Sequence, residues 1–230
     1  MFLFTNVIDI AVGVATVLGV GMLVPQTLSM MRTRDLRGVS ASWIGGGVAI
    51  NSGWIVYALS AGLWGLLPVS IGSLGLYVAM AVMFARHGRS EFPRALMTAG
   101  LVVALFVIAG LVGGGVSAFG LAIALTYAAQ FSPAAWSALF SRDVSGISAP
   151  TWIMGLTEAG IWAFYGASLG DSALLFGGAG AAVMSALVLL GLFRSALPEN
   201  EGENEEGPLT PSASRPSRRG FAISRGARRP

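Results

Sequence analysis

Long apolar runs, separated by short stretches rich in glycine, proline and charge, dominate the pattern of this chain. Each run can cross a hydrocarbon core of about 30 Å, which takes roughly 20 helical residues. A backbone inside lipid must satisfy its own hydrogen bonds, so we expect every run to be a helix. The pattern predicts helices at about 6–32, 41–60, 64–86, 94–112, 115–141, 149–169 and 172–194.

The first three and the last three predicted helices carry the same landmarks at a spacing of 108 residues. The coinciding positions are turn formers, charges and aromatic residues, which shared hydrophobicity explains poorly. We interpret the match as an internal duplication. The coinciding pairs are Pro25 and Pro133, Ser29 and Ser137, Arg34 and Arg142, Asp35 and Asp143, Gly38 and Gly146, Ser40 and Ser148, Trp54 and Trp162, Tyr57 and Tyr165, Gly72 and Gly180, and Arg86 and Arg194.

A unit of three helices ends on the opposite side of the membrane from its start, so two directly joined copies would be inverted. The helix at 94–112 has no partner at the offset and restores both copies to one orientation. We therefore predict an all-α membrane protein with bundles at residues 1–88 and 115–194 and an inversion linker at 89–114. Parallel repeats of this kind place a site at their interface, near the midplane.

Composition and charge agree with this topology. The chain is 54% hydrophobic and only 11% charged, more apolar than one soluble core can hide. All 14 basic residues are arginines in one set of loops and in the tail, while the loops near Gly62, Gly113 and Gly170 hold none. The positive-inside rule then puts the N-terminus outside and the C-terminus in the cytoplasm. Topology explains the net charge of +3 better than nucleic-acid binding does.

Both ends of the chain lie outside this pattern of spans. The first run lacks a basic start and a small-residue cleavage site, so we do not expect a cleaved signal peptide. Residues 195–230 combine an acidic run at 199–206 with proline, serine, glycine and arginine. They cannot bury enough apolar surface to offset the entropy of ordering, which predicts a disordered tail. Its arginines can act as a topology signal or touch anionic lipids.

Two tryptophans at equivalent positions mark the candidate site. Asn51 comes three residues before Trp54 and Glu158 four before Trp162, so each polar group shares a helix face with its tryptophan. Stacking against a solute and plain packing are both open for the two rings.

Glu158 lies near the middle of its helix, where an ionisable group is expensive and suggests function. It can bind a cation or cationic substrate, or couple transport to protons. A structural role, with the carboxyl group protonated or hydrogen-bonded to Gln130, Thr157 or a serine, is the alternative.

Pro25 and Pro133 fall inside predicted helices, where each removes a backbone hydrogen bond and introduces a kink. Together with Gln26, which follows Pro25, they are candidate hinges for closing the cytoplasmic halves. A static bend is the alternative interpretation.

Several of these residues resemble the PQ-loop superfamily of SemiSWEETs, SWEETs and cystinosin-type carriers. The resemblance covers residues 1–194 and rests on Val24-Pro25-Gln26, on Arg34-Asp35 with Gly38-Val39-Ser40, and on Trp54 with Tyr57. It implies a transporter for a small solute, a sugar or similar metabolite, held between the two tryptophans. The family's asparagine positions fall on Ser70 and Gly178, which counts against a sugar.

Enzyme chemistry finds no support in the sequence. The only histidine, His87, lies in an arginine-rich loop, and the chain has neither cysteine nor lysine. We therefore expect no cofactor and no metal site. A solute carrier, with or without proton coupling, and a non-transporting receptor or scaffold are the two remaining classes. The alanine, glycine and arginine content hints at a bacterial plasma membrane, and association of two copies into a homo-oligomer stays open.

Overall fold

The computed structural model describes residues 2–37, 39–141, 144 and 147–196, and within them it contains helices and no strand. The predicted tail beyond Ala196 lies outside the described residues, as do Arg142, Asp143 and Gly146 of the second repeat. The elements are α1 (Phe2–Thr33), α2 (Ala41–Ala61), the 3-10 turn η1 (Trp64–Leu66), α3 (Leu67–His87), α4 (Phe92–Gly113), α5 (Val116–Ala129), α6 (Ser132–Phe140), α7 (Ala149–Leu169) and α8 (Ser172–Ala196).

Six helical stretches of the described chain are long and apolar enough to cross a membrane. They are α1, α2, η1 with α3, α4, α5 with α6, and α8. The seventh, α7, has the predicted bounds and a length of 21 residues, but it is more polar and holds Glu158. It packs against α8 and α1, so it belongs to the same fold. The prediction of an all-α membrane fold is confirmed.

The duplication is visible at the ends of α2 and α7. Ser40 and Ser148 occupy the N-cap positions, and the Ser40 hydroxyl accepts a hydrogen bond from the Trp43 backbone N–H at 3.2 Å. Both helices end at a glycine in the left-handed region, Gly62 with φ of 72° and Gly170 with φ of 67°. Glycine carries no Cβ penalty there, so it ends a helix readily.

The span predicted at 115–141 is present, but its helix is interrupted. The chain forms α5 and α6, with a tight turn at Gln130–Phe131 between them. Pro133 has no N–H to donate to the carbonyl of Ala129, and the Ala134 N–H instead donates to Phe131 O at 3.1 Å. Pro133 therefore lies in the first turn of a new helix, whereas Pro25 lies inside an uninterrupted α1.

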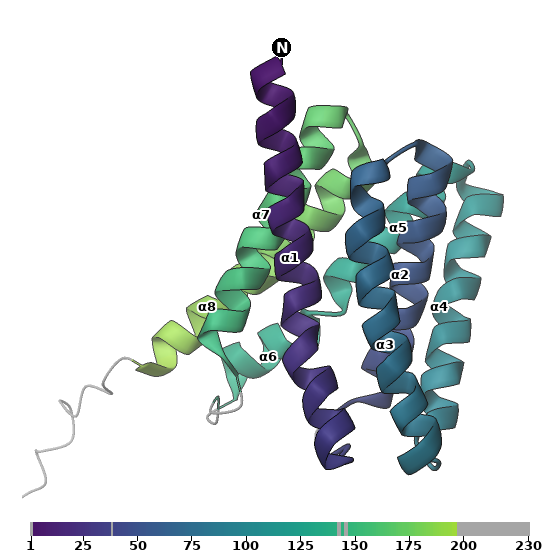
Figure 1. Cartoon of the computed structure of the whole chain (residues 1–230), viewed down its shortest axis with the longest axis vertical. Helices are drawn as coiled ribbons and strands as arrows, with labels where there is room; N and C mark the ends of the chain where they lie inside the picture. Colours follow the sequence, from purple (N-terminus) through teal and green to yellow (C-terminus); the bar gives the residue numbers. More distant parts are fainter. Residues whose placement is uncertain (1, 38, 142–143, 145–146, 197–230) are drawn as a thin grey trace, which may run out of the picture. The chain divides into compact units, whose positions relative to one another are not determined.

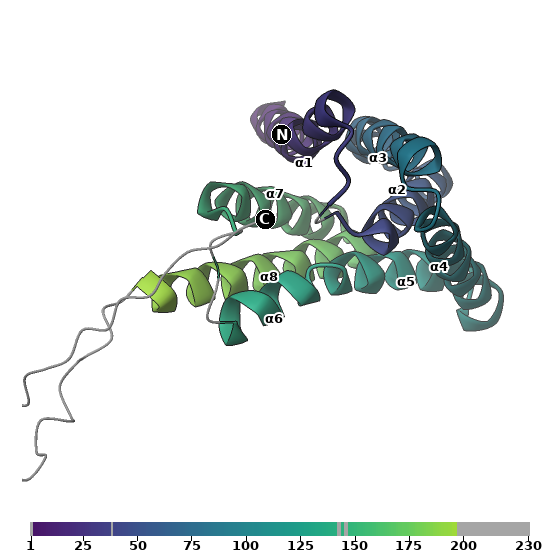
Figure 2. The same cartoon turned by 90° about the horizontal axis from the view of Figure 1, so that it is seen from below.

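The helices pack as two bundles with the same internal order (Figures 1 and 2). In the first bundle α3 contacts both α1 and α2, and in the second α8 contacts α7 on one side and α5 and α6 on the other. Between the bundles, α1 contacts α7 and α2 contacts α5, so the first helix of each repeat meets the second helix of the other. The remaining helix, α4, packs against α2 and α5.

Candidate functional site

Trp54 on α2 and Trp162 on α7 lie in one buried cluster that draws on both bundles. They keep only 7% and 5% of their surface exposed. Each ring meets the tyrosine three residues later edge to face: the centroids of Trp54 and Tyr57 are 5.9 Å apart at 69°, and those of Trp162 and Tyr165 are 6.0 Å apart at 67°. The repeats thus build the same aromatic pair twice.

Trp54 also reaches into the second bundle. Its ring lies edge to face with Tyr127 of α5, at a centroid distance of 6.4 Å. Its Cζ2 atom lies 3.4 Å from the position that a Cβ on Gly177 of α8 would take. The ring is therefore at the interface between the repeats, where the sequence pattern places a site.

Glu158 is buried beside Trp162, with 6% of its surface exposed. Its Oε1 atom accepts a hydrogen bond from Trp162 Nε1 at 3.1 Å. On its other side it lies against Gly19 of α1, where a Cβ would overlap Oε1. Glycine at position 19 therefore makes room for the carboxyl group and brings it to the contact between α1 and α7.

Neither Thr157 nor Gln130, which a structural role would offer to Glu158 as hydrogen-bond partners, is bonded to its carboxyl group. The Thr157 hydroxyl donates to Ile153 O at 2.9 Å on its own helix. The Gln130 Oε1 atom is the one fully buried side-chain polar atom, among the described residues, that has no hydrogen-bond partner. Trp162 is the hydrogen-bond partner that the structure gives to Glu158.

The other predicted site residues, Asn51 on α2, Ser70 on α3 and Gly178 on α8, make contacts within their own helix or bundle. Asn51, half-buried, donates from Nδ2 to Gly47 O at 2.8 Å. The buried Ser70 hydroxyl donates to Leu66 O at 2.9 Å. Gly178 faces α7 within its own bundle, because a Cβ there would overlap the backbone nitrogen of Ala163. The structure thus brings Trp54, Trp162 and Glu158 together, while Ser70 and Gly178 serve contacts inside their bundles.

The three candidate hinge residues are exposed. Pro25 and Gln26 lie on the surface of α1, and Pro133 lies on the surface of α6. None of them contributes to the buried cluster around the tryptophans.

Two contacts that the sequence reasoning missed close one end of the interface, which we call the outer end because the turns there carry no arginine. The Tyr57 hydroxyl donates to Asp171 Oδ2 at 2.7 Å, and Asp171 Oδ1 accepts the Leu174 N–H at 2.8 Å. At the equivalent place, the Tyr165 hydroxyl lies against the backbone of Gly65, 2.9 Å from the position that a Cβ there would take. Each tyrosine therefore crosses to the turn between the second and third helix of the other repeat.

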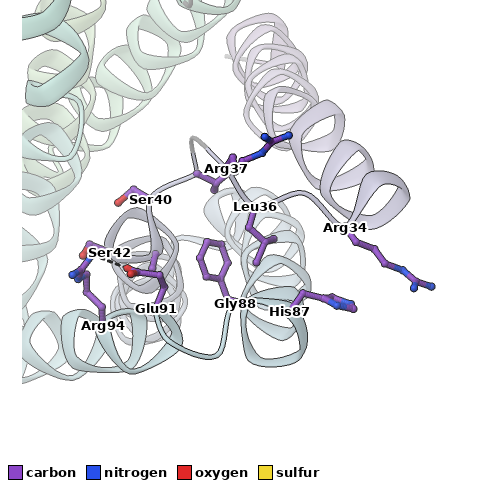
Figure 3. A pocket seen from close by; sticks show the side chains of 12 residues that line it. Arg34, Leu36, Arg37, Ser40, Ser42, His87, Gly88, Glu91 and Arg94 are labelled. Carbon is purple, nitrogen blue, oxygen red and sulfur yellow. Dashed lines mark hydrogen bonds and ion pairs between the residues drawn. The ribbon is translucent and has the colours of Figure 1, made fainter. Parts of the chain in front are cut away.

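A pocket of about 420 Å³ lies at the opposite, arginine-rich end of the first bundle (Figure 3). Arg37 and Arg94, which line it, form ion pairs of 2.6 Å with Asp35 and Glu91. Hydrogen bonds from Arg37 lower the pKa of Asp35 to about 2. The lining comes from the α1–α2 loop, the ends of α2 and α3, and the start of α4, so this pocket is separate from the tryptophan site.

The fold resembles a solved structure of known type. No protein-family model matches the sequence, and no characterised protein matches it by sequence. A eukaryotic SWEET transporter, determined at 3.7 Å resolution, superposes with a TM-score of 0.64 and 14% sequence identity over 82% of this chain and 98% of that one. At this identity the likeness shows the fold, which is SWEET-like.

Proposed function

We propose that this chain is a membrane carrier that moves a small organic solute, a sugar or similar metabolite, by alternating access. The observation that carries the proposal is the pair of Trp–Tyr units, Trp54 with Tyr57 and Trp162 with Tyr165, placed equivalently at the interface of two parallel bundles. A site between rigid, repeated bundles can be opened to either side when one bundle rocks against the other.

The closed outer end supports this mechanism. The hydrogen bond between Tyr57 and Asp171 and the contact between Tyr165 and Gly65 join the bundles beyond the two tryptophans. Since Trp54 and Trp162 are almost wholly buried, a solute reaches their faces only when the bundles separate. Breaking the two tyrosine contacts would open the site outward, and the proline-bearing α1 would adjust in the same step.

The orientation and location belong to the same proposal. The arginines of the described helices cluster at one end, with Arg32, Arg86 and Arg194 in last turns, which supports a cytoplasmic placement of that end. The N-terminus is then outside the cell. The SWEET-like fold supports membership of the PQ-loop superfamily. The alanine, glycine and arginine content of the sequence supports a plasma-membrane location in a bacterium.

A proton-coupled carrier is the second candidate, and the burial of Glu158 favours it. A carboxyl group that takes up and releases a proton at the contact of α1 and α7 would change its charge as the two helices move. The solute in that case is a neutral metabolite, and the proton gradient drives its accumulation.

Uptake into proteoliposomes tests the proposal. Labelled sugars and amino acids are offered with and without an inward proton gradient to the wild type, Trp162→Ala and Glu158→Gln. We expect saturable uptake that falls at least about tenfold in Trp162→Ala, because the ring forms one wall of the site. Gradient-stimulated uptake that disappears in Glu158→Gln would indicate the coupled form.

The control is Trp136→Ala, since Trp136 is an exposed tryptophan on α6 that lies outside the central cluster. Its uptake should equal that of the wild type. A wild-type protein that is folded yet moves no solute would contradict the carrier and favour a receptor or scaffold on the same fold.

A further inference from the structure

We propose that the solute bound between the bundles is a small organic cation, and that its protonated or quaternary nitrogen pairs with Glu158. This inference rests on the carrier proposed above and narrows its small organic solute to a cationic metabolite in place of a sugar. It follows from the charges, the hydrogen-bonding groups and the aromatic rings that surround the site.

The charge of Glu158 has no counterpart in the surrounding protein. The ion pairs of the described residues join Arg37 to Asp35 and Arg94 to Glu91, both at the arginine-rich end. Every arginine of the described helices lies in a first or last turn, and the chain has no lysine. An isolated buried carboxylate is strongly unfavourable, so its neutralising charge must come from a bound cation or a proton.

The polar groups of the predicted site and of the helices around it leave one hydrogen-bond acceptor unused. The Trp162 indole N–H donates to Glu158, Asn51 donates to Gly47 O, and the Ser70 hydroxyl donates to Leu66 O. An acceptor is left over: Gln130 Oε1 is buried without a partner at the end of α5, one turn from Tyr127, whose ring contacts Trp54. A ligand with N–H groups could satisfy this acceptor, whereas a proton on Glu158 leaves it unpaired.

The aromatic rings of the site also favour a cation. Indole and phenol faces attract cations through the ring quadrupole, and tryptophan does so best. Trp54 and Trp162 stand with Tyr57, Tyr165 and Tyr127 around the interface that holds the carboxyl group. An aromatic wall with one carboxylate and no basic side chain suits an amine, whose positive charge interacts favourably with both.

The contact between Gly19 and Glu158 links a charge bound at Glu158 to the relative position of α1 and α7. The carboxyl group of Glu158 lies against the backbone of α1 at Gly19, where a Cβ would overlap its Oε1 atom and require the carboxyl group to move. A shift of α1 relative to α7 therefore changes the space beside Glu158. Entry and release of a cation at Glu158 are for this reason linked to the contact between the bundles.

Matched probe pairs test the inference in the full chain, purified in lipid nanodiscs. The cations are choline, ethanolamine and putrescine, and their neutral twins are 3,3-dimethylbutan-1-ol, ethylene glycol and 1,4-butanediol. Binding is followed by tryptophan fluorescence and by the shift in melting temperature. We expect at least one cation to bind about tenfold or more tighter than its twin, since a cation that is desolvated beside a carboxylate and an indole gains this much.

Variants show whether Glu158 is responsible. In Glu158→Gln the preference for the cation should fall about tenfold, because the carbonyl can still accept from Trp162 while the charge is gone. Glu158→Asp should keep part of the preference. Glu91→Gln, which removes a carboxylate paired with Arg94 outside the site, should bind as the wild type does. Size-exclusion profiles establish that each variant folds.

The inference is overturned if no cation binds, if the neutral twins bind as well as the cations, or if Glu158→Gln keeps the full preference. Uptake experiments separate this failure from failure of the carrier. A neutral solute carried with a proton through Glu158 would leave the carrier intact and refute the cationic substrate. A cation that binds in a Glu158-dependent way but is never transported would support the site and refute the carrier.

Discussion

The two bundles have the same helix arrangement but differ in the side chains buried inside them. Both place the third helix between the first and the second, and both build a Trp–Tyr pair of nearly the same geometry. The buried carboxyl group, however, lies only in the second bundle, at Glu158. The residue 108 positions earlier is Ile50, which is buried and apolar. Duplication supplies the frame, and divergence of single residues supplies the chemistry.

A second difference lies one turn away. In the first bundle, Tyr77 of α3 presses its ring against Gly47 of α2 and lies 5.0 Å from the ring of Trp43. In the second bundle the equivalent pair is Gly155 and Ser185, where a Cβ added to the glycine would lie 3.5 Å from Ser185 Oγ, an ordinary contact distance. The first bundle is therefore filled at this level by a large aromatic ring, and the second by a small hydroxyl.

This difference yields the largest expected effect on stability. Gly47→Ala should lower the free energy of unfolding by about 1–3 kcal/mol, because the new methyl group overlaps the ring of Tyr77. Gly155→Ala should change it by less than about 0.5 kcal/mol, since a Cβ there has room. Unfolding in mixed micelles of increasing denaturing detergent measures both.

A double-mutant cycle tests the cause. In a Tyr77→Ser background, which gives the first bundle the side chain of the second, Gly47→Ala should lose most of its effect. Equal effects of the two glycine substitutions, or an undiminished effect of Gly47→Ala without the ring, would show that the bundles are packed alike.

The sequence predicted the bundles well because apolar runs determine where spanning helices begin and end. It also placed Glu158 beside Trp162, since residues four apart on one helix must be neighbours. It failed at Gln130–Phe131, because Pro133 stands in an apolar run just as Pro25 does. Whether a proline is tolerated inside a helix or begins a new one depends on neighbouring helices, which the pattern of one run does not contain.

The two bundles also differ in the contact that each tyrosine makes at the outer end. Tyr57 donates to the carboxylate of Asp171, whereas the Tyr165 hydroxyl only lies against the uncharged backbone of Gly65. A hydrogen bond to a charged group is worth about 1.5–3 kcal/mol and one between neutral groups about 0.5–1.5 kcal/mol. Tyr57→Phe should therefore lower stability by about 1.5 kcal/mol, more than Tyr165→Phe does.

Thiol labelling measures the same contact during opening. The chain has no cysteine, so Ala173→Cys introduces one reactive group next to the contact, at a position that is 1% exposed. A membrane-impermeant reagent should label it about tenfold faster in Tyr57→Phe, as expected when a closed state loses about 1.4 kcal/mol. A faster rate in Tyr165→Phe than in Tyr57→Phe would refute the assignment of the stronger contact to Asp171.

The sequence alone did not reveal this contact, although it held a signal. Tyr57 and Tyr165 occupy equivalent positions, and Asp171 is a charged residue in a turn between apolar helices. The tyrosine and the carboxylate are 114 residues apart, and only the packing of the two bundles brings them within 2.7 Å. The same holds for Gly19 and Glu158, whose contact depends on how α1 meets α7.

Replacing the prolines should give the smallest difference in stability between the bundles, and it tests whether α1 bends during transport. Pro25 interrupts the hydrogen bonding of a continuous α1, so Pro25→Ala should restore a bond to Gly21 O and raise stability by about 1 kcal/mol, less than in a soluble helix because neighbouring groups already compensate. Pro133 occupies the first turn of α6, where its missing N–H has no helical partner, so Pro133→Ala should change stability by less than about 0.5 kcal/mol.

If α1 bends at Pro25 during transport, Pro25→Ala should slow initial uptake although the protein is more stable. Faster or unchanged uptake in that variant would make Pro25 a static bend, and the turn at Gln130–Phe131 would then be the better candidate for the moving joint.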